Sequence, residues 1–159
     1  MIEWLMIIHV MSAAVLFGAG LGTAFYMFYV NLQQDIQLIA DATKQVVFAD
    51  WLLTGTAGIV QFFTGIILIY LKGYAFSAFW IVTGMLGYLI AGACWIPVVY
   101  LQMRCRDLAF EAIKNNTGLP KKYYQYYKVW WILGIPAFIS LLVVFYVMTN
   151  RPIACCIWF

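Results

Sequence analysis

Four long apolar segments are the feature that most limits how this chain can fold. They lie near residues 4–30, 47–71, 78–102 and 129–149, and each reaches the roughly 20 apolar residues that cross a bilayer as a helix. Charged residues make up only 9% of the chain, against about 25% in soluble domains. The segments therefore predict an all-α protein of the lipid bilayer. Short connections favour an up-down-up-down four-helix transmembrane bundle, with residues 1–159 forming a single domain.

Basic residues are distributed unevenly among the polar connections. The first and third connections hold seven of them, and only Lys72 and Arg151 fall on the other side. The positive-inside rule predicts that these two connections face the cytoplasm and that both termini face the periplasm of a bacterial inner membrane. The third helix is expected to extend into the cytoplasm to about residue 114, before the helix-ending stretch NNTGLP. The seven basic residues are Lys44, Arg104, Arg106, Lys114, Lys121, Lys122 and Lys128.

Two further expectations concern the first apolar segment and the binding of nucleic acid. The first segment begins with Glu3 and no Lys or Arg, unlike a signal peptide, so we expect it to stay in the mature protein. The net charge of +3 is small and scattered, which does not indicate a nucleic-acid partner.

A polar stripe follows one face of the second segment. Asp50, Thr54, Ala57, Gln61 and Gly65 recur at helical spacing. Polar side chains of a membrane helix face neighbouring helices rather than lipid, so this stripe is predicted to face the bundle interior. Asp50, Thr54 and Gln61 are its polar members, and they are candidates for a proton path.

Asp50 is expected at the cytoplasmic start of the second helix, on the same side as Arg104 and Arg106. An ionisable residue inside a membrane segment is a candidate functional site. A structural clasp between Asp50 and these arginines is one interpretation of this inner-face charge cluster. An anion or lipid-headgroup site, or the inner end of a proton path through Gln61, is the other.

His9 is the only histidine of the chain and lies in an apolar run near the outer end of the first helix. Imidazole is a common ligand of haem iron. Gly20, Ala13, Gly84 and Gly87 would leave space for a porphyrin, and Met85 lies at a similar depth as a candidate second ligand. One histidine cannot supply a bis-histidine haem within one chain. A hydrogen-bonded structural histidine, a quinone contact and a proton relay remain alternatives.

Other classes of site are not indicated. Ser12 and His9 share a helix, but Asp50 is expected across the membrane, so no catalytic triad forms. The stretch GAGLG lies inside a membrane span rather than after a strand, so it is not a nucleotide loop. Gly18 and Gly22 form a GxxxG pattern that fits close packing inside the bundle or a homo-oligomer.

Three blocks of sequence carry a family resemblance. HVMSAAVLFGAGLGTAF, ADWLLTGTAGIVQFFTG and GACWIPVVYLQMRCRDLA resemble a bacterial family of predicted inner-membrane proteins of unknown function, which implies four membrane helices. The early histidine also resembles HemJ-type protoporphyrinogen oxidases and CopD-type copper-resistance proteins. The HemJ resemblance implies that His9 ligates haem. Those enzymes depend on a lysine in a later membrane helix, which the membrane part of the third helix lacks, so their activity is not carried over.

The sequence therefore predicts a small redox-type membrane protein that binds haem b through His9. Its chemistry would be electron transfer to a quinone or oxidation of a porphyrin-like substrate, and whether it is an enzyme stays open. The alternative is a non-catalytic subunit of a membrane complex, or a scaffold, that binds a partner or anionic lipid through the basic third connection.

Overall fold

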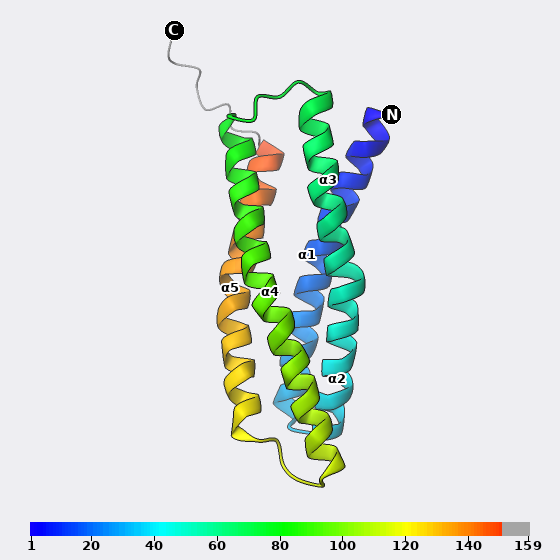
Figure 1. Cartoon of the computed structure of the whole chain (residues 1–159), viewed down its shortest axis with the longest axis vertical. Coiled ribbons are helices and arrows are strands. Elements are labelled where there is room, and N and C mark those ends of the chain that lie inside the picture. Colours follow the sequence, from blue (N-terminus) through cyan, green and yellow to red (C-terminus); the bar gives the residue numbers. More distant parts are fainter. Residues whose placement is uncertain (151–159) are drawn as a thin grey trace.

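The computed structural model describes residues 1–150, and Arg151 lies outside the described residues. All the regular elements of this part are helical, and four helical rods are long and apolar enough to cross a membrane. Figure 1 shows the rods running up and down in turn, with the N-terminus and the end of the last helix at the same end of the bundle. The predicted fold is confirmed. The elements are α1 (Ile2–Gln33), α2 (Ile36–Ala49), η1 (Asp50–Gly55), α3 (Thr56–Leu71), α4 (Phe79–Lys114) and α5 (Lys121–Asn150).

The second rod begins earlier than the sequence suggested. We expected the residues between the first two segments, up to residue 47, to form a polar connection, but α1 and α2 are separated only by Gln34 and Asp35. Asp35 caps α2, because its Oδ1 accepts from the backbone N–H groups of Gln37 (2.8 Å) and Leu38 (3.2 Å). α2 then buries one apolar face and leaves its polar residues outside, so the polar stretch is an amphipathic helix.

The last rod also begins earlier, at Lys121 rather than near residue 129. Pro120 precedes it, and Tyr123 and Trp130 are buried on its inner face. α4 ends at Lys114, where the sequence predicted the end of its extension. Most of the polar stretch between the third and fourth apolar segments is therefore helical, and only the residues between Lys114 and Lys121 connect α4 to α5.

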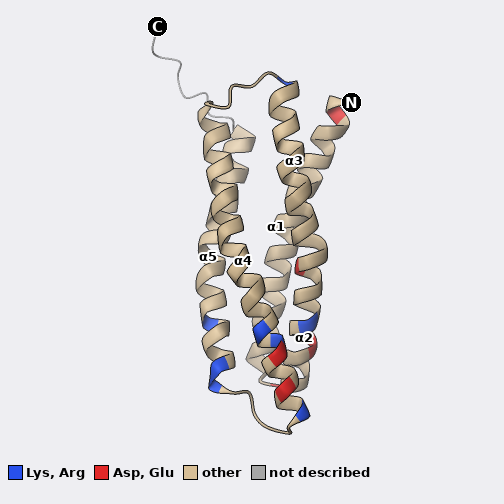
Figure 2. Cartoon of the chain, viewed as in Figure 1, with Lys and Arg blue, Asp and Glu red and all other residues tan. Residues whose placement is uncertain are grey.

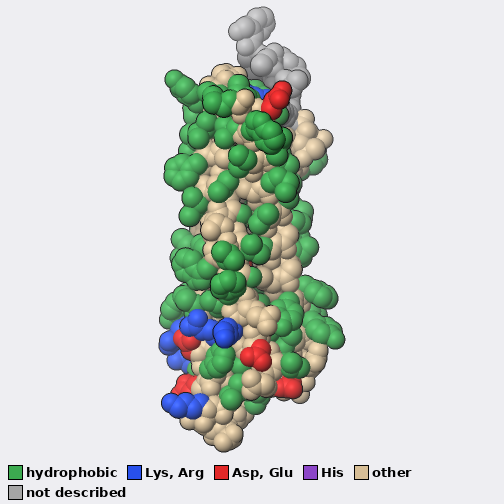
Figure 3. Space-filling model, turned by 90° about the vertical axis from the view of Figure 1, so that its right-hand side faces the viewer, with side chains coloured by type: hydrophobic (Ala, Val, Ile, Leu, Met, Phe, Trp, Pro, Cys, Tyr) green, Lys and Arg blue, Asp and Glu red, His purple; other side chains and the backbone are tan. Residues whose placement is uncertain are grey.

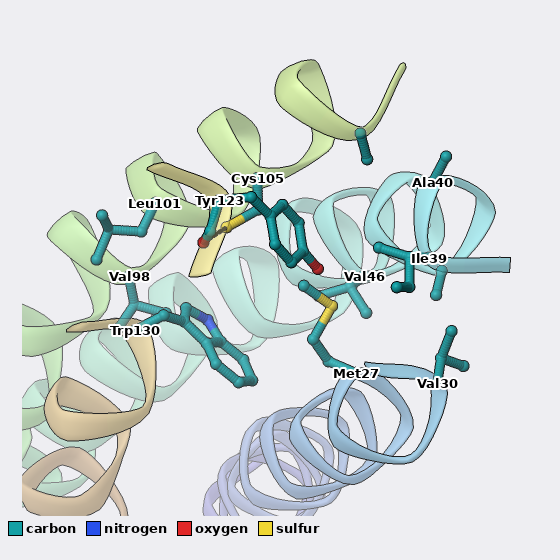
Figure 4. Close-up of a cluster of buried hydrophobic side chains, with 12 residues drawn as sticks. Met27, Val30, Ile39, Ala40, Val46, Val98, Leu101, Cys105, Tyr123 and Trp130 are labelled. Carbon is teal, nitrogen blue, oxygen red and sulfur yellow. Dashed lines mark hydrogen bonds between the residues drawn. The ribbon is translucent and has the colours of Figure 1, made fainter. Parts of the chain in front are cut away.

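The hydrophobic core lies at one end of the bundle, where α1, α2, α4 and α5 meet (Figure 4). Tyr123 is fully buried there, and its hydroxyl donates to Asn31 Oδ1 at 2.8 Å, which joins α5 to α1. Figure 2 shows that most Lys and Arg side chains gather at this same end, here called the basic end. The core is made of Met27, Val30, Ile39, Ala40, Ala42, Val46, Val98, Leu101, Cys105, Ala109, Tyr123 and Trp130.

Tyr123→Phe is expected to destabilise the protein by about 1 kcal/mol, because it removes the hydrogen bond from the buried Tyr123 side chain to the half-buried Asn31 Oδ1. Thermal unfolding in detergent, followed by circular dichroism, measures the change. Tyr124→Phe is the matched control, because Tyr124 is 53% exposed. Equal effects of the two substitutions would contradict the role given to the Asn31 bond.

The rods form two closely packed pairs, α4 with α5 and α1 with α3, and α2 bridges α1 and α4 at the basic end. Glycines set the approach of α4 to α5. A Cβ at Gly87 would lie 2.6 Å from Val144 Cγ2, and a Cβ at Gly84 would collide with Met148. The expectation that Gly87 leaves room for a porphyrin is therefore wrong, because Val144 and the backbone of Ser140 on α5 fill that space, while for Gly84 it stays a prediction.

Large apolar side chains cover the outside of the rods away from the basic end, while charged side chains are concentrated at that end (Figure 3). This distribution fits a shaft surrounded by lipid. Gly18 and Gly22 lie on this outer surface, and nothing lies within 4 Å of a Cβ placed at either one. Packing within residues 1–150 therefore does not explain the GxxxG pattern, and a homo-oligomer stays a prediction.

Candidate functional site

His9 lies at the centre of a polar cluster between α1 and α3. Its Nδ1 is 2.8 Å from Thr64 Oγ1, and its Nε2 is 3.0 Å from Gln61 Nε2. The hydroxyl of Ser12 donates to Gln61 Oε1 at 2.6 Å and also lies 2.9 Å from the carbonyl of His9. Gln61 and Thr64, one turn apart on α3, thus hold the imidazole, and Ser12, one turn after His9 on α1, holds Gln61.

The partners of His9 define which of its nitrogens carries the proton. The Thr64 hydroxyl donates to the carbonyl of Val60 at 2.6 Å, so its oxygen is free to accept from His9 Nδ1–H. The Gln61 amide nitrogen can only donate, so His9 Nε2 accepts from it. The geometry therefore corresponds to a neutral imidazole with its proton on Nδ1 and its lone pair on Nε2.

The imidazole packs against the backbone of α3 at a glycine. A Cβ at Gly65 would lie 3.2 Å from His9 Cε1, closer than carbon atoms normally approach. The absence of a side chain at Gly65 therefore makes room for the His9 ring, a role that the spacing of the polar stripe did not reveal.

A pocket of about 570 Å³ lies beside this cluster, and we call it the His9 pocket. His9, Gln61 and Met85 all line it, so the structure brings the two predicted cofactor-binding residues to one space. Most of its wall is aliphatic or aromatic. Lys72 lines it as well, the one charged side chain to do so in the described part of the chain.

Asp50 lies in a second polar cluster, and its position corrects two expectations. It is not at a helix start, because α2 precedes it without interruption, and it opens the π-helical turn η1. Its carboxylate accepts from Gln102 Nε2 at 2.6 Å and from Thr54 Oγ1 at 3.1 Å, with Thr23 Oγ1 at 3.5 Å.

The expected clasp between Asp50 and the two arginines does not form. Arg104 is exposed, and Arg106 pairs with Asp107 at 2.8 Å, the one salt bridge within residues 1–150. Arg106 follows Gln102 by one turn of α4, but its guanidinium bonds Asp107 instead of Asp50. The inner-face charge cluster is therefore replaced by a neutral shell of amide and hydroxyl donors.

The polar stripe is thus divided between two clusters. Thr54 belongs to Asp50, and Gln61 belongs to His9. At 1.5 Å per residue, Asp50 and Gln61 are roughly 16 Å apart along the rod. A proton path joining them stays a prediction.

Sequence reasoning missed several partners. Ser12 and Thr64 contact the His9 cluster, and Thr23 and Gln102 contact Asp50. Their common signal is a hydroxyl or amide in an apolar helix. Gln102 lies on the face of α4 that the small residues Gly84 and Gly87 mark, so its inward direction was readable, although its partner was not.

Together the fold and the two clusters define a class of protein: a polytopic helical membrane protein that holds one imidazole and one carboxylate inside its bundle. The model of one family, described as predicted integral membrane protein (DUF2269), matches residues 3–152, and the chain belongs to this family. No curated protein and no solved structure matches the chain. The resemblance to a membrane family of unknown function is confirmed, and the likeness to HemJ-type and CopD-type proteins stays a prediction.

Proposed function

We propose that this protein is a membrane redox protein that binds haem b in the His9 pocket, where His9 would hold the haem iron. Bound haem would supply one-electron chemistry, for electron transfer to a quinone or oxidation of a porphyrin-like substrate. The observation that supports the proposal is that His9, whose hydrogen-bond partners fit a proton on Nδ1 and a lone pair on Nε2, lines a largely apolar pocket together with Met85.

The hydrogen bond from His9 to Thr64 supports this role. Metal-ligating histidines almost always donate their other ring N–H to a fixed acceptor, which orients the ring and makes the ligating nitrogen more basic. Thr64 provides that acceptor at 2.8 Å from Nδ1. Gln61 Nε2 lies 3.0 Å from His9 Nε2, so its amide must rotate aside for a metal to bind there.

The pocket wall supports a porphyrin more than a bare metal ion. Within residues 1–150, no group of three or more His, Cys, Asp or Glu side chains is arranged to hold a metal. A haem needs only one or two protein ligands, and Met85 is available as the second. Lys72 would pair with a propionate carboxylate of the porphyrin.

The visible spectrum tests the proposal directly. The protein is purified in mild detergent from cells with ample haem, and spectra are recorded before and after reduction with dithionite. We expect a Soret band that shifts on reduction, as a haem iron changes oxidation state. A colourless protein from such cells would overturn the proposal.

A second candidate function rests on the basic end. Lys121, Lys122 and Lys128 are exposed there at the start of α5. We infer that this end faces the cytoplasm and contacts anionic lipid headgroups, each lysine contributing about 1 kcal/mol. The function would then be that of a non-catalytic subunit or scaffold at the inner membrane surface.

Replacing these three lysines by glutamine is expected to reduce the anionic lipid that co-purifies with the protein, while the bundle stays folded. Mass spectrometry of the extracted lipids measures the change. Lys72→Gln, at the opposite end, serves as the control. Unchanged lipid content in the triple variant would remove the main support for this function.

A further inference from the structure

A second pocket of about 570 Å³ lies around Asp50, and we call it the Asp50 pocket. It is lined by residues of α1, η1, α3, α4 and α5. Several of its lining side chains are exposed on the outer surface, including Leu21 (47%), Ile59 (61%) and Ile139 (53%). The pocket therefore opens sideways, toward the lipid that surrounds the shaft, and a ligand that dissolves in the bilayer can reach it.

Asp50 is buried without a cationic partner. Its side chain is 3% exposed, and its three hydrogen-bond donors are the neutral groups of Gln102, Thr54 and Thr23. No Lys, Arg or His within residues 1–150 forms an ion pair with it. A carboxylate inside a membrane bundle is costly unless a positive charge accompanies it. Both carboxylate oxygens accept hydrogen bonds from these donors, which is the arrangement expected of an ionised carboxylate that could pair with a cationic ligand.

Unpaired polar atoms gather at the same pocket. Within residues 1–150, the buried side-chain nitrogen and oxygen atoms that lack any hydrogen-bond partner are Trp95 Nε1, Gln102 Oε1 and Trp130 Nε1. All three residues line the Asp50 pocket. Buried polar groups are nearly always paired, so such a concentration needs a partner that the chain does not supply. Gln102 Oε1 is an unpaired acceptor next to the carboxylate, whereas the two indole N–H groups are donors that an oxygen atom of a ligand would satisfy.

The walls of the pocket are rich in aromatic rings. Trp131 packs edge-on against Phe28 and Trp130, and Trp95 packs edge-on against Trp51, so the rings are held in fixed positions. Aromatic faces attract organic cations, most strongly where water is excluded. The aromatic side chains lining the pocket are Phe17, Phe25, Phe28, Tyr88, Trp95, Trp130, Trp131 and Phe138.

The backbone of this region is also unusual. Asp50–Gly55 forms a π-helical turn inside an otherwise regular rod. Such turns are rare and are frequent at functional sites, where they change the direction of a side chain. This turn sets Asp50 and Thr54 together on the side of the rod that faces α1 and α4.

From these observations we propose that the Asp50 pocket binds a lipid-soluble organic cation, which pairs with the Asp50 carboxylate and packs against the surrounding aromatic rings. Asp50 supplies the charge, Gln102 Oε1 supplies an additional acceptor, and Trp95, Trp130 and Trp131 supply the wall. The site is separate from the His9 cluster, because Thr23 and His9 are about 21 Å apart along α1. The proposal therefore does not depend on haem binding.

Two hydrophobic ions of matched size and shape test the proposal. Equilibrium dialysis of the purified protein in detergent measures the binding of tetraphenylphosphonium and, separately, of tetraphenylborate. We expect saturable binding of the phosphonium and none of the borate, because only the cation complements Asp50. Equal binding of both ions, or no saturable binding of either, would overturn the proposal, since a purely apolar pocket for acyl chains does not distinguish their charge.

Variants locate the site. Asp50→Asn keeps the shape of the side chain and is expected to weaken phosphonium binding about tenfold or more, which corresponds to at least 1.4 kcal/mol. Asp107→Asn removes an exposed carboxylate of α4 and is expected to leave binding unchanged, as is His9→Ala. Wild-type affinity in Asp50→Asn, checked for folding by gel filtration, would contradict the assignment.

Trp131→Leu provides a variant that retains Asp50. It is expected to weaken phosphonium binding by the loss of one aromatic wall, and it keeps the test decisive if Asp50→Asn does not fold. Wild-type affinity in this variant would show that the cation lies elsewhere.

Discussion

His9→Ala is expected to abolish the Soret band of the purified protein. His9 is the only histidine of the chain, so no other imidazole can take its place within the chain. The neighbouring donors cannot replace it, because the amide of Gln61 and the hydroxyl of Thr64 are weak ligands for haem iron. Visible spectroscopy at equal protein concentration measures the loss.

Two controls separate ligand loss from misfolding. Ser12→Ala removes the hydroxyl that bonds the Gln61 side chain and lies near the carbonyl oxygen of His9. It leaves the imidazole in place, so the Soret band of this variant is expected to persist. Imidazole added to His9→Ala is expected to restore the band, because it fits the space of the lost ring. A full Soret band in His9→Ala without added imidazole would exclude His9 as the ligand.

Gly87→Ala is expected to destabilise the bundle by about 1–3 kcal/mol through overpacking. The added Cβ would lie 2.6 Å from Val144 Cγ2 and 3.2 Å from the backbone oxygen of Ser140. The side chain of Val144 can move, but the backbone of α5 cannot yield without separating the two helices. Unfolding in mixed detergent micelles, followed by circular dichroism, measures the difference.

Gly92→Ala is the matched control, because it changes the same helix by the same group and nothing lies within 4 Å of the new Cβ. Alanine favours helix over glycine by about 1 kcal/mol, so this variant is expected to be as stable as the wild type or slightly more stable. If Gly87→Ala were as stable as Gly92→Ala, the close approach of α4 and α5 at Gly87 would be refuted.

The membrane helices were predictable because lipid imposes a minimum length and an apolar composition on each span. The helix starts were not, because they depend on groups outside the apolar segments. α2 begins after the N-cap residue Asp35 and buries one narrow face, which the many polar residues of this stretch made hard to recognise in the sequence. α5 begins eight residues before the predicted span because Tyr123 anchors its first turns in the core.

The central residues of the candidate site were predictable from the sequence, but most of their hydrogen-bond partners were not. Helical spacing placed Asp50, Thr54 and Gln61 on one inner face, and depth along the helices placed Met85 near His9. The partner of Asp50 was predicted wrongly, because charge alone favoured Arg104 and Arg106 over Gln102. The relative rotation of α3 and α4 decides that choice, and it follows from packing across the whole bundle rather than from any local pattern.

The haem content of the wild-type protein tests the central claim most directly. Pyridine haemochromogen analysis, combined with quantitative amino-acid analysis of the same sample, gives the moles of haem b per mole of chain. Because each chain has its own His9 pocket, the account predicts one haem b per chain. Protein without haem from haem-sufficient cells, or one haem shared by two chains through paired histidines, would contradict it.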